Sequence, residues 1–230
     1  MCCRYTLAEI ERLLVLCKQL GIPPPKFALK RRYNVAPAQR MPVALAQDGV
    51  PWTESVFGFA PKSSSVGGSE LLINARAETM SDKPTFRDAV KRRRCLVPAD
   101  GFYEWEVSRR ARLPHYFQLR DQRAFFFAGL WQPGRADEAP GGFTIITTAP
   151  NALVGSIHHR MPLILTPKAA KSWLSDHPLS RTQLDEICRP YPAEQMTSCR
   201  VSPTMNNVRH DAPDCIVPVE SDPELPLRFT

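Results

Sequence analysis

The chain has 230 residues, of which 43% are hydrophobic and 23% are charged, and it contains seven cysteines. This length allows one large domain or two small ones, and the composition is that of a soluble globular protein. We expect no membrane span, because no apolar run approaches about 20 residues, and no signal peptide. The cysteines lack CxxC or Cys/His ligand spacing, which argues against a disulfide framework or a zinc site and favours the reducing cytoplasm.

Positive charge predominates along the chain. The net charge is +7 and the isoelectric point is near 9.2. Basic residues cluster at 30–32, 91–94 and 109–112. Such clusters suit a polyanion such as nucleic acid, and they equally suit a solvated surface. The 23 prolines are spread through the whole chain, which favours a loop-rich β fold over a helical bundle.

The N-terminus carries a cysteine, Cys2, directly after Met1. Removal of Met1 would leave Cys2 with a free α-amine beside its thiol, and both groups are partly deprotonated near neutral pH. Together they can condense with an aldehyde to a thiazolidine, or the thiol can attack a carbonyl with the amine as its base. From these residues alone, the simpler interpretation is that Cys2 merely follows the start codon.

The first predicted element is a helix that begins after a capping box formed by Thr6 and Glu9. Apolar residues then recur on one helical face, namely Ile10, Leu13, Leu14, Cys17 and Leu20. Gly21 and the prolines at 23–25 end the helix. We therefore expect Cys17 in the core.

Strands are predicted at 42–46 and 52–59, joined by a turn at 47–49 and followed by a surface loop at 63–69. A buried strand then begins at Leu71. Alternation along this strand places Asn74 and Arg76 on one face.

After a short helix at 86–91, a strand carries Glu104 between Tyr103 and Trp105. Partial desolvation between two aromatic rings would raise the pKa of Glu104 and suit it to acid–base chemistry. Taken alone, a glutamate on the outer face of a strand is the simpler interpretation.

The second half of the chain alternates strands with short helices. Strands are predicted at 115–119, 124–131, 143–148 and 196–201, and helices at 166–174 and 182–188, with Thr166 and Pro167 as N-cap and first helical residue. Histidine suits proton transfer near neutral pH. His158 and His159 cannot be separated by chemistry, and strand alternation would send their side chains opposite ways. The tail after Pro218 is expected to be weakly ordered.

Several motifs occur in the order found in the SOS response-associated peptidase (SRAP) family, and the chain resembles that family from Cys2 to about Ile216. The motifs are Cys2 after Met1, Tyr33–Pro37, Asn74–Thr79, Cys95–Trp105, Ile145–Thr148 and Ile157–Pro162. The resemblance implies an α+β fold, a single domain at residues 1–217 whose β-barrel-like, mostly antiparallel core is flanked by helices, with a tail at 218–230.

The resemblance also implies a DNA-damage function, the covalent capture of abasic sites in single-stranded DNA as a thiazolidine on Cys2. Asn74 would hold the N-terminal residue and the sugar. Glu104 would steer proton transfers at the α-amine and the sugar hydroxyl. His158, which matches the family's I-H-x-R-M-P, would assist ring opening and outranks His159. Ring opening of a hemiacetal needs a proton donor and an acceptor, which Glu104 and His158 can supply.

The same matching implies a basic cleft for single-stranded DNA. The residues expected to contact DNA are Arg76, at a phosphate beside the lesion, and Arg4, Asn34, Pro37 and Arg160. Unpaired bases would stack on apolar platforms, for which Phe57, Phe59 and Trp105 are candidates, although all three suit a core equally well. The reaction needs no metal or cofactor, and we expect a monomer that associates with DNA and not with membrane, in the cytoplasm or at the nucleoid.

Two alternatives stay open. One is a thiol peptidase that uses Cys2 as nucleophile with Glu104 or His158 as base, and the other is a non-covalent single-stranded or modified-DNA-binding module. The sequence also departs from the family at Cys3, where glycine is usual, so this thiol could compete for the aldehyde. At 56–61 the chain has V-F-G-F-A-P in place of the usual R-W-G-L-I-P, and Met205 stands where valine is usual.

Overall fold

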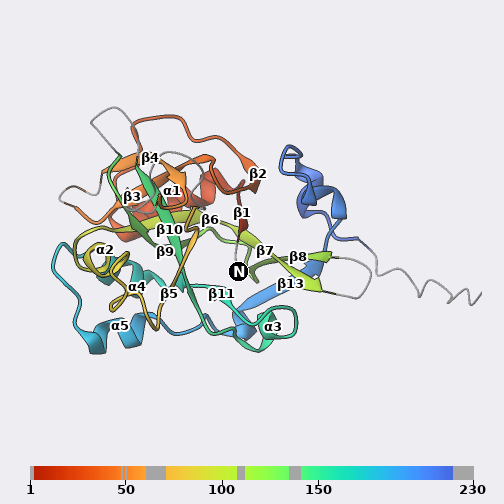
Figure 1. The fold of residues 1–230 in the computed structure, drawn as a ribbon. Coiled ribbons are helices and arrows are strands. Elements are labelled where there is room, and N and C mark those ends of the chain that lie inside the picture. Colours follow the sequence, from red (N-terminus) through yellow and green to blue (C-terminus); the bar gives the residue numbers. More distant parts are fainter. Residues whose placement is uncertain are drawn as a thin grey trace, which may run out of the picture.

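A computed structural model describes residues 3–47, 49, 51–60, 71–107, 112–134 and 141–219. Met1, Cys2, Asp48 of the predicted turn at 47–49, the loop at 63–69 and residues 220–230 of the predicted tail lie outside these ranges. Two sheets and a set of short helices make up the described part of the chain (Figure 1).

The smaller sheet has five antiparallel strands in the order β13-β8-β7-β1-β2. The strands are β1 (Arg4–Leu7), β2 (Arg32–Val35), β7 (Gly101–Val107), β8 (Arg112–Leu119) and β13 (Met196–Arg200). Strand β7 occupies the centre of this sheet, with β1 on one side and β8 on the other.

The larger sheet has eight strands, and five of them close into a ring in which β10 pairs with β4 on one side and with β9 on the other. The strands are β3 (Arg40–Leu45), β4 (Trp52–Phe57), β5 (Asn74–Arg76), β6 (Arg94–Ala99), β9 (Phe125–Trp131), β10 (Gly142–Thr148), β11 (Met161–Pro162) and β12 (Ile164–Leu165). Only the pairings of β10 with β4 and with β5 are parallel among the described strands. The predicted α+β fold with a mostly antiparallel core is therefore confirmed, and closure of the ring leaves few strand edges exposed.

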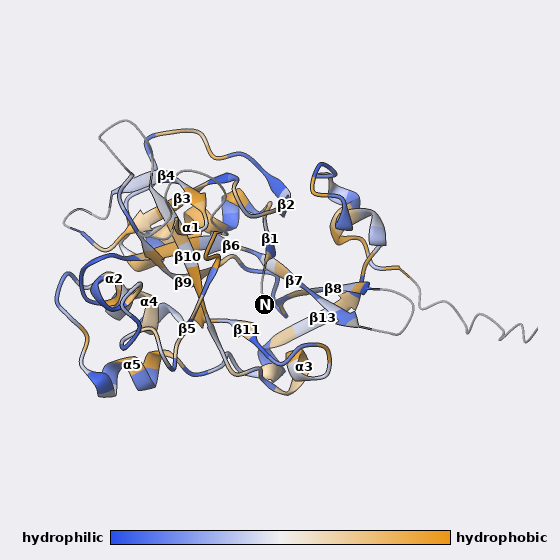
Figure 2. Ribbon diagram, viewed as in Figure 1, coloured by the Kyte–Doolittle hydropathy of each residue, from blue (hydrophilic) through white to orange (hydrophobic). Residues whose placement is uncertain are grey.

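Aromatic side chains fill the space within and beside the ring. Phe57 and Phe143 stack with ring centroids 5.2 Å apart, and Tyr5 from the smaller sheet meets Phe57 edge-on at 5.7 Å. Figure 2 shows hydrophobic colours on ring strands such as β3 and β9, and hydrophilic colours on much of the outer loops. Phe57, Phe59 and Trp105 are at most 8% exposed, so these three candidates for base stacking belong to the core.

The helices are short and lie outside the ring. They are α1 (Ile10–Leu20), α2 (Arg87–Arg92), α3 (Ala152–Gly155), α4 (Pro167–Trp173) and α5 (Arg181–Ile187), with 3-10 turns η1 (Ala193–Gln195), η2 (Pro203–Asn206) and η3 (Pro213–Ile216). Among the residues that the structure describes, none of these helices has the length and apolar character needed to cross a bilayer.

Helix α4 forms as its sequence predicts. The Thr166 side chain accepts a hydrogen bond from the backbone N–H of Ala169, and Pro167 occupies the first turn. The helix ends at Trp173, whose indole N–H lies within hydrogen-bonding distance of the carbonyls of Cys95 and Gly129 on β6 and β9. One buried side chain thus fixes α4 to two ring strands.

The start of α1 differs from the prediction. Helix α1 does end at Gly21, which adopts a left-handed conformation (φ 72°), and Cys17 is buried as expected. Thr6, however, lies in β1, and the N-cap Glu9 makes no capping hydrogen bond with its side chain. Leu14, assigned to the buried face, is 40% exposed. The capping-box motif is local, whereas Thr6 is held in β1 by pairing with the distant strand β7.

The capping function belongs instead to Asp100, between β6 and β7. Its buried carboxylate accepts hydrogen bonds from the Thr6 hydroxyl and from the backbone N–H groups of Ala8 and Glu9. The next residue must be glycine, because a Cβ on Gly101 would lie 2.1 Å from the Tyr116 hydroxyl. This junction joins the ring to the smaller sheet and starts α1.

We predict that Asp100→Ala lowers the free energy of unfolding by about 2–4 kcal/mol, because it leaves two backbone N–H groups and a buried hydroxyl without their acceptor. Urea denaturation measures the loss. Asp176→Ala, at an exposed carboxylate, serves as the control and should cost less than about 0.5 kcal/mol. Equal effects of the two substitutions would contradict the capping role.

Candidate active site

The centre of the candidate site is Glu104, in the middle strand of the smaller sheet. Its side chain is 2% exposed. Burial raises the pKa of this carboxyl to about 7. The expected desolvation of Glu104 is therefore confirmed, although Tyr103 and Trp105 lie on the opposite face of the strand, and the interpretation of Glu104 as a solvent-exposed strand residue is wrong. A carboxyl that titrates near neutral pH can both accept and donate protons under physiological conditions.

His158, in the loop between α3 and β11, has its Nδ1 atom 3.8 Å from a Glu104 carboxylate oxygen. The same Nδ1 lies 3.0 Å from the Arg160 carbonyl and 3.1 Å from the Arg160 amide nitrogen. Depending on its tautomer, the ring therefore donates to the carbonyl or accepts from the amide. Burial lowers the pKa of His158 below its ordinary value, which favours the neutral ring.

The loop that carries His158 is anchored at both ends. Asn151 caps α3 through its side chain, and the His158 N–H donates to the carbonyl of Val154 in that helix. After the histidines, Met161 and Pro162 pair with β10 as the short strand β11. Residues 158–160 form a bend and not a strand, so the prediction that His158 and His159 point opposite ways is wrong. Their rings lie side by side, with centroids 4.4 Å apart.

Arg160 holds this loop to β5 and β10. Its guanidinium donates to both carboxylate oxygens of Glu78, at 2.7 and 2.9 Å, and to the carbonyl of Thr147 at 2.6 Å. The sequence predicted a site role for Arg160 and none for Glu78. Glu78 and Arg160 are 82 positions apart, so no local spacing in the sequence connects them. The one sequence feature that pointed to Glu78 was its place in the same motif as Asn74 and Arg76.

Asn74 and Arg76 share the exposed side of β5, as predicted, while Ala75 between them is buried. The Asn74 amide nitrogen lies 3.4 Å from the Ile145 carbonyl. Its amide oxygen is buried, and no described residue donates a hydrogen bond to it. Arg76 is exposed, and no described residue forms a hydrogen bond or ion pair with its guanidinium. Both residues thus retain polar groups for a further partner.

Arg4 and Asn34 are internal. The Arg4 guanidinium donates to the Asn34 side chain at 2.7 Å and to the Met205 carbonyl at 3.1 Å, and the Asn34 amide donates to the carbonyls of Met205, Asn207 and His210. These contacts fasten residues 205–210 to β1 and β2. Their predicted contact with DNA stays a prediction, as does that of the half-buried Pro37.

Cys3 lies beside Glu104. The register of β1 against β7 pairs Arg4 with Tyr103, so its antiparallel continuation sets Cys3 opposite Glu104. Burial, followed by the nearby Glu104 charge, raises the pKa of the Cys3 thiol. A protonated thiol is a poor nucleophile, which reduces the competition expected from Cys3. Cys2 itself is outside the described residues.

Three arginines of the basic clusters have structural partners. Arg94 is 1% exposed and donates to five backbone carbonyls, among them those of Val90 and Trp173. Arg31 pairs with Glu11, and Arg32 pairs with Asp211. Arg109 and Arg110 lie outside the described residues. The net charge therefore overstates the number of cations available to a polyanion.

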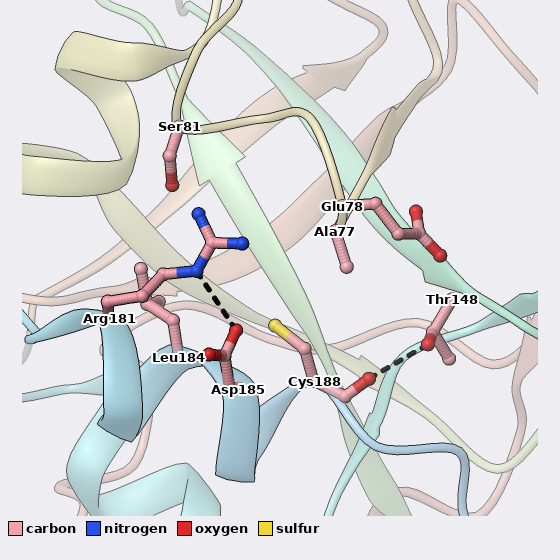
Figure 3. Close-up of a pocket in the computed structure, with 8 residues that line it drawn as sticks. All are labelled: Ala77, Glu78, Ser81, Thr148, Arg181, Leu184, Asp185 and Cys188. Atoms are coloured by element: carbon pink, nitrogen blue, oxygen red, sulfur yellow. Dashed lines mark hydrogen bonds and ion pairs between the residues drawn. The ribbon is translucent and has the colours of Figure 1, made fainter.

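A cavity of about 240 Å³ adjoins this region, between the turn after β5 and helix α5 (Figure 3). Arg181 donates to Asp185 at 3.1 Å, and the Thr148 hydroxyl donates to the Cys188 carbonyl at 2.8 Å. Burial raises the pKa of the Cys188 thiol to about 12, so this cysteine is protonated. The cavity contains none of the predicted catalytic residues among its lining.

Among the described residues, one group of three potential metal ligands is present. The ligand atoms of His210, Asp214 and Cys215 lie within 4.8 Å of one another. His210 Nε2 is 2.9 Å from each Asp214 carboxylate oxygen, and the Cys215 thiol donates to the His210 carbonyl. An ion pair and a thiol hydrogen bond account for this arrangement without a metal.

Comparison with known proteins places the chain in a family. The model of the SOS response associated peptidase (SRAP) family matches residues 1–208. This chain belongs to the SRAP family. It is 35% identical over 227 residues to the abasic site processing protein YoqW of Bacillus subtilis, covering 94% of this chain and 99% of that protein.

Another relative and two solved structures are consistent with this family assignment. The Escherichia coli abasic site processing protein YedK is 32% identical over 193 residues, covering 82% of this chain and 85% of that one. A crystal structure of a Bacteroides thetaiotaomicron protein has a TM-score of 0.79 at 24% identity, covering 95% of this chain and all of that one. A phage-related protein from Bordetella bronchiseptica has a TM-score of 0.70 at 26% identity, covering 87% and 94%. These solved structures share the SRAP-like fold.

We predict that Glu104 makes stability fall as pH rises. Its folded pKa lies above the ordinary value of 4.5, so the folded protein binds more protons than the unfolded chain between about pH 4.5 and 7, and raising the pH through this window costs up to about 3 kcal/mol. In Glu104→Gln this loss should disappear, as measured by urea denaturation at pH 5 and 8.5. Glu106→Gln, at an exposed carboxylate in the same strand, is the matched control. Parallel profiles of wild type and Glu104→Gln would refute the prediction.

Proposed function

We propose that the protein processes abasic sites in single-stranded DNA by capturing them covalently on Cys2 after removal of Met1. The observation that carries the proposal is the buried Glu104 carboxyl beside His158, in the middle of β7 and opposite Cys3. Cys2 directly precedes Cys3 in the sequence, and consecutive Cα atoms are about 3.8 Å apart. The names of the relatives YoqW and YedK supply the substrate class.

The proposed reaction begins with the ring-opened aldehyde of the abasic sugar. The neutral α-amine of Cys2 adds to the aldehyde carbon, and loss of water gives a Schiff base. The Cys2 sulfur then adds to the same carbon, and its proton passes to the nitrogen as the thiazolidine ring closes. The adduct is one water lighter than the sum of its partners.

Glu104 and His158 supply the proton transfers that this sequence needs. With a pKa of about 7, Glu104 can take a proton from the α-amine and return it to the departing hydroxyl. The neutral His158 ring can accept a proton from the sugar hydroxyl during ring opening. The buried Asn74 amide oxygen is an acceptor suited to the α-amine or to a sugar hydroxyl.

The family description also names a peptidase, and the same groups could serve one, with Cys2 as nucleophile and Glu104 or His158 as base. That reaction would further require an oxyanion hole. A non-covalent DNA-binding module is the remaining alternative. The aldehyde reaction is preferred because a paired amine and thiol favour ring closure, and because the named relatives process abasic sites.

We predict that the protein, shown by mass to lack Met1, forms an adduct with an abasic single-stranded oligonucleotide at the summed mass minus one water. Cys2→Ala should abolish this adduct. Cys3→Ala is the matched control and should retain it. Mass spectrometry of the incubated mixtures measures all three. An adduct that persists in Cys2→Ala would overturn the proposal, and cleavage of a peptide without any adduct would favour the peptidase.

We also predict that Arg76→Ala weakens binding to an intact single-stranded oligonucleotide and flattens its salt dependence. One lost phosphate contact should reduce the slope of log affinity against log salt by about 0.7. Fluorescence anisotropy at several salt concentrations measures the slope. Arg12→Ala, at an exposed arginine of α1 that pairs with Glu9, is the control. An unaltered slope in Arg76→Ala would remove this residue from the phosphate site.

A further inference from the structure

His159 is the residue of the His158 loop to which the proposed reaction assigns no role. Its side chain is exposed, whereas the His158 side chain is 16% exposed. The two rings are 4.4 Å apart between centroids and tilted by 33°. His159 therefore covers one face of the His158 ring.

This contact brings two ionisable rings together. An imidazole ordinarily titrates near pH 6.5, and two such groups in contact compete for protons, because the charge of one disfavours the charge of the other. The other charged groups that act on His158 are the N-terminal amine and Arg160, together with Glu104, whose carboxylate lies 3.8 Å from Nδ1. Arg160 is itself paired with Glu78, which leaves His159 as the titratable cation neighbour of His158 in the described loop.

The contact also restrains the ring. One edge of His158 is fixed by the Arg160 backbone at Nδ1. A second ring packed on its face limits rotation about the remaining side-chain bond, because movement would break the ring contact. The orientation that sets Nδ1 3.8 Å from Glu104 is thereby held from two directions.

We propose that His159 is a positioning residue that keeps His158 neutral and fixes its ring against the Glu104 carboxylate. Its consequence for catalysis rests on the proposed function, in which neutral His158 accepts a proton during ring opening. The charge on His159 and the packing of its ring are separable contributions. Protonation of His159 favours neutral His158, and the flat ring supplies the packing.

The test is an NMR pH titration of the His158 ring protons in the free, full-length protein, assigned by their absence in His158→Gln. In His159→Gln the titration midpoint of His158 should move to higher pH by roughly half a pH unit, because a competing positive charge is gone. His159→Phe, which keeps a flat ring without the charge, should show the same upward movement while preserving the chemical shifts of the neighbouring Arg160 amide.

His177→Gln is the matched control, because His177 is an exposed histidine that pairs with Asp176. It should leave the His158 midpoint unchanged. An unchanged midpoint in His159→Gln, or an equal movement in His177→Gln, would overturn the inference. A His159→Phe variant that titrates like wild type would overturn the part that assigns the effect to charge.

The rate of abasic-site capture against pH supplies the functional result. Its acid limb should move to higher pH in His159→Gln by the same amount as the His158 midpoint, with the maximal rate changed less than about threefold. The titration uses protein without DNA and decides the inference even if no capture occurs. Absence of capture with a moved midpoint would reject the proposed function alone.

Discussion

The hydrogen bonds of the buried Asp100 carboxylate fix the register on which the site depends. They join the start of α1 and the Thr6 hydroxyl to the point where β6 passes from the ring into β7 of the smaller sheet. Side chains alternate along a strand, so a slip of β1 by one residue would turn Tyr5 out of the core and carry Cys3 away from Glu104. The Asp100 hydrogen bonds near the C-terminal end of β1 thus help to keep Cys3, before its N-terminal end, opposite Glu104.

The proposed chemistry depends on a second constraint, the burial of Glu104 between two sheets. Desolvation stabilises the protonated carboxyl and brings its pKa to about 7, at a cost in stability when the group ionises. The same environment favours neutral His158. A proton donor and a proton acceptor therefore coexist near pH 7, which is the condition for opening a hemiacetal ring and closing another on the same carbon.

The arginines divide into structural and available groups, and the division is not visible in the net charge. Arg94 and Arg4 donate hydrogen bonds to backbone carbonyls, and Arg32 pairs with Asp211. Arg76 remains exposed on β5 beside the orphaned Asn74 oxygen. The proposed phosphate contact thus rests on the placement of a single exposed arginine, and several arginines that stand out in the sequence hold the fold together.

The sequence by itself determined the features governed by neighbours along the chain. Gly21 ends α1 because it accepts a left-handed backbone, and Thr166 caps α4. The order of the motifs along the chain indicated the family and, with it, the α+β fold. Only the tertiary structure decided that Thr6 belongs to a strand, that Glu104 is buried, and that Glu78 neutralises Arg160. It alone showed that the rings of His158 and His159 are in contact. These outcomes depend on residues up to 94 positions apart, and local periodicity holds no information about such contacts.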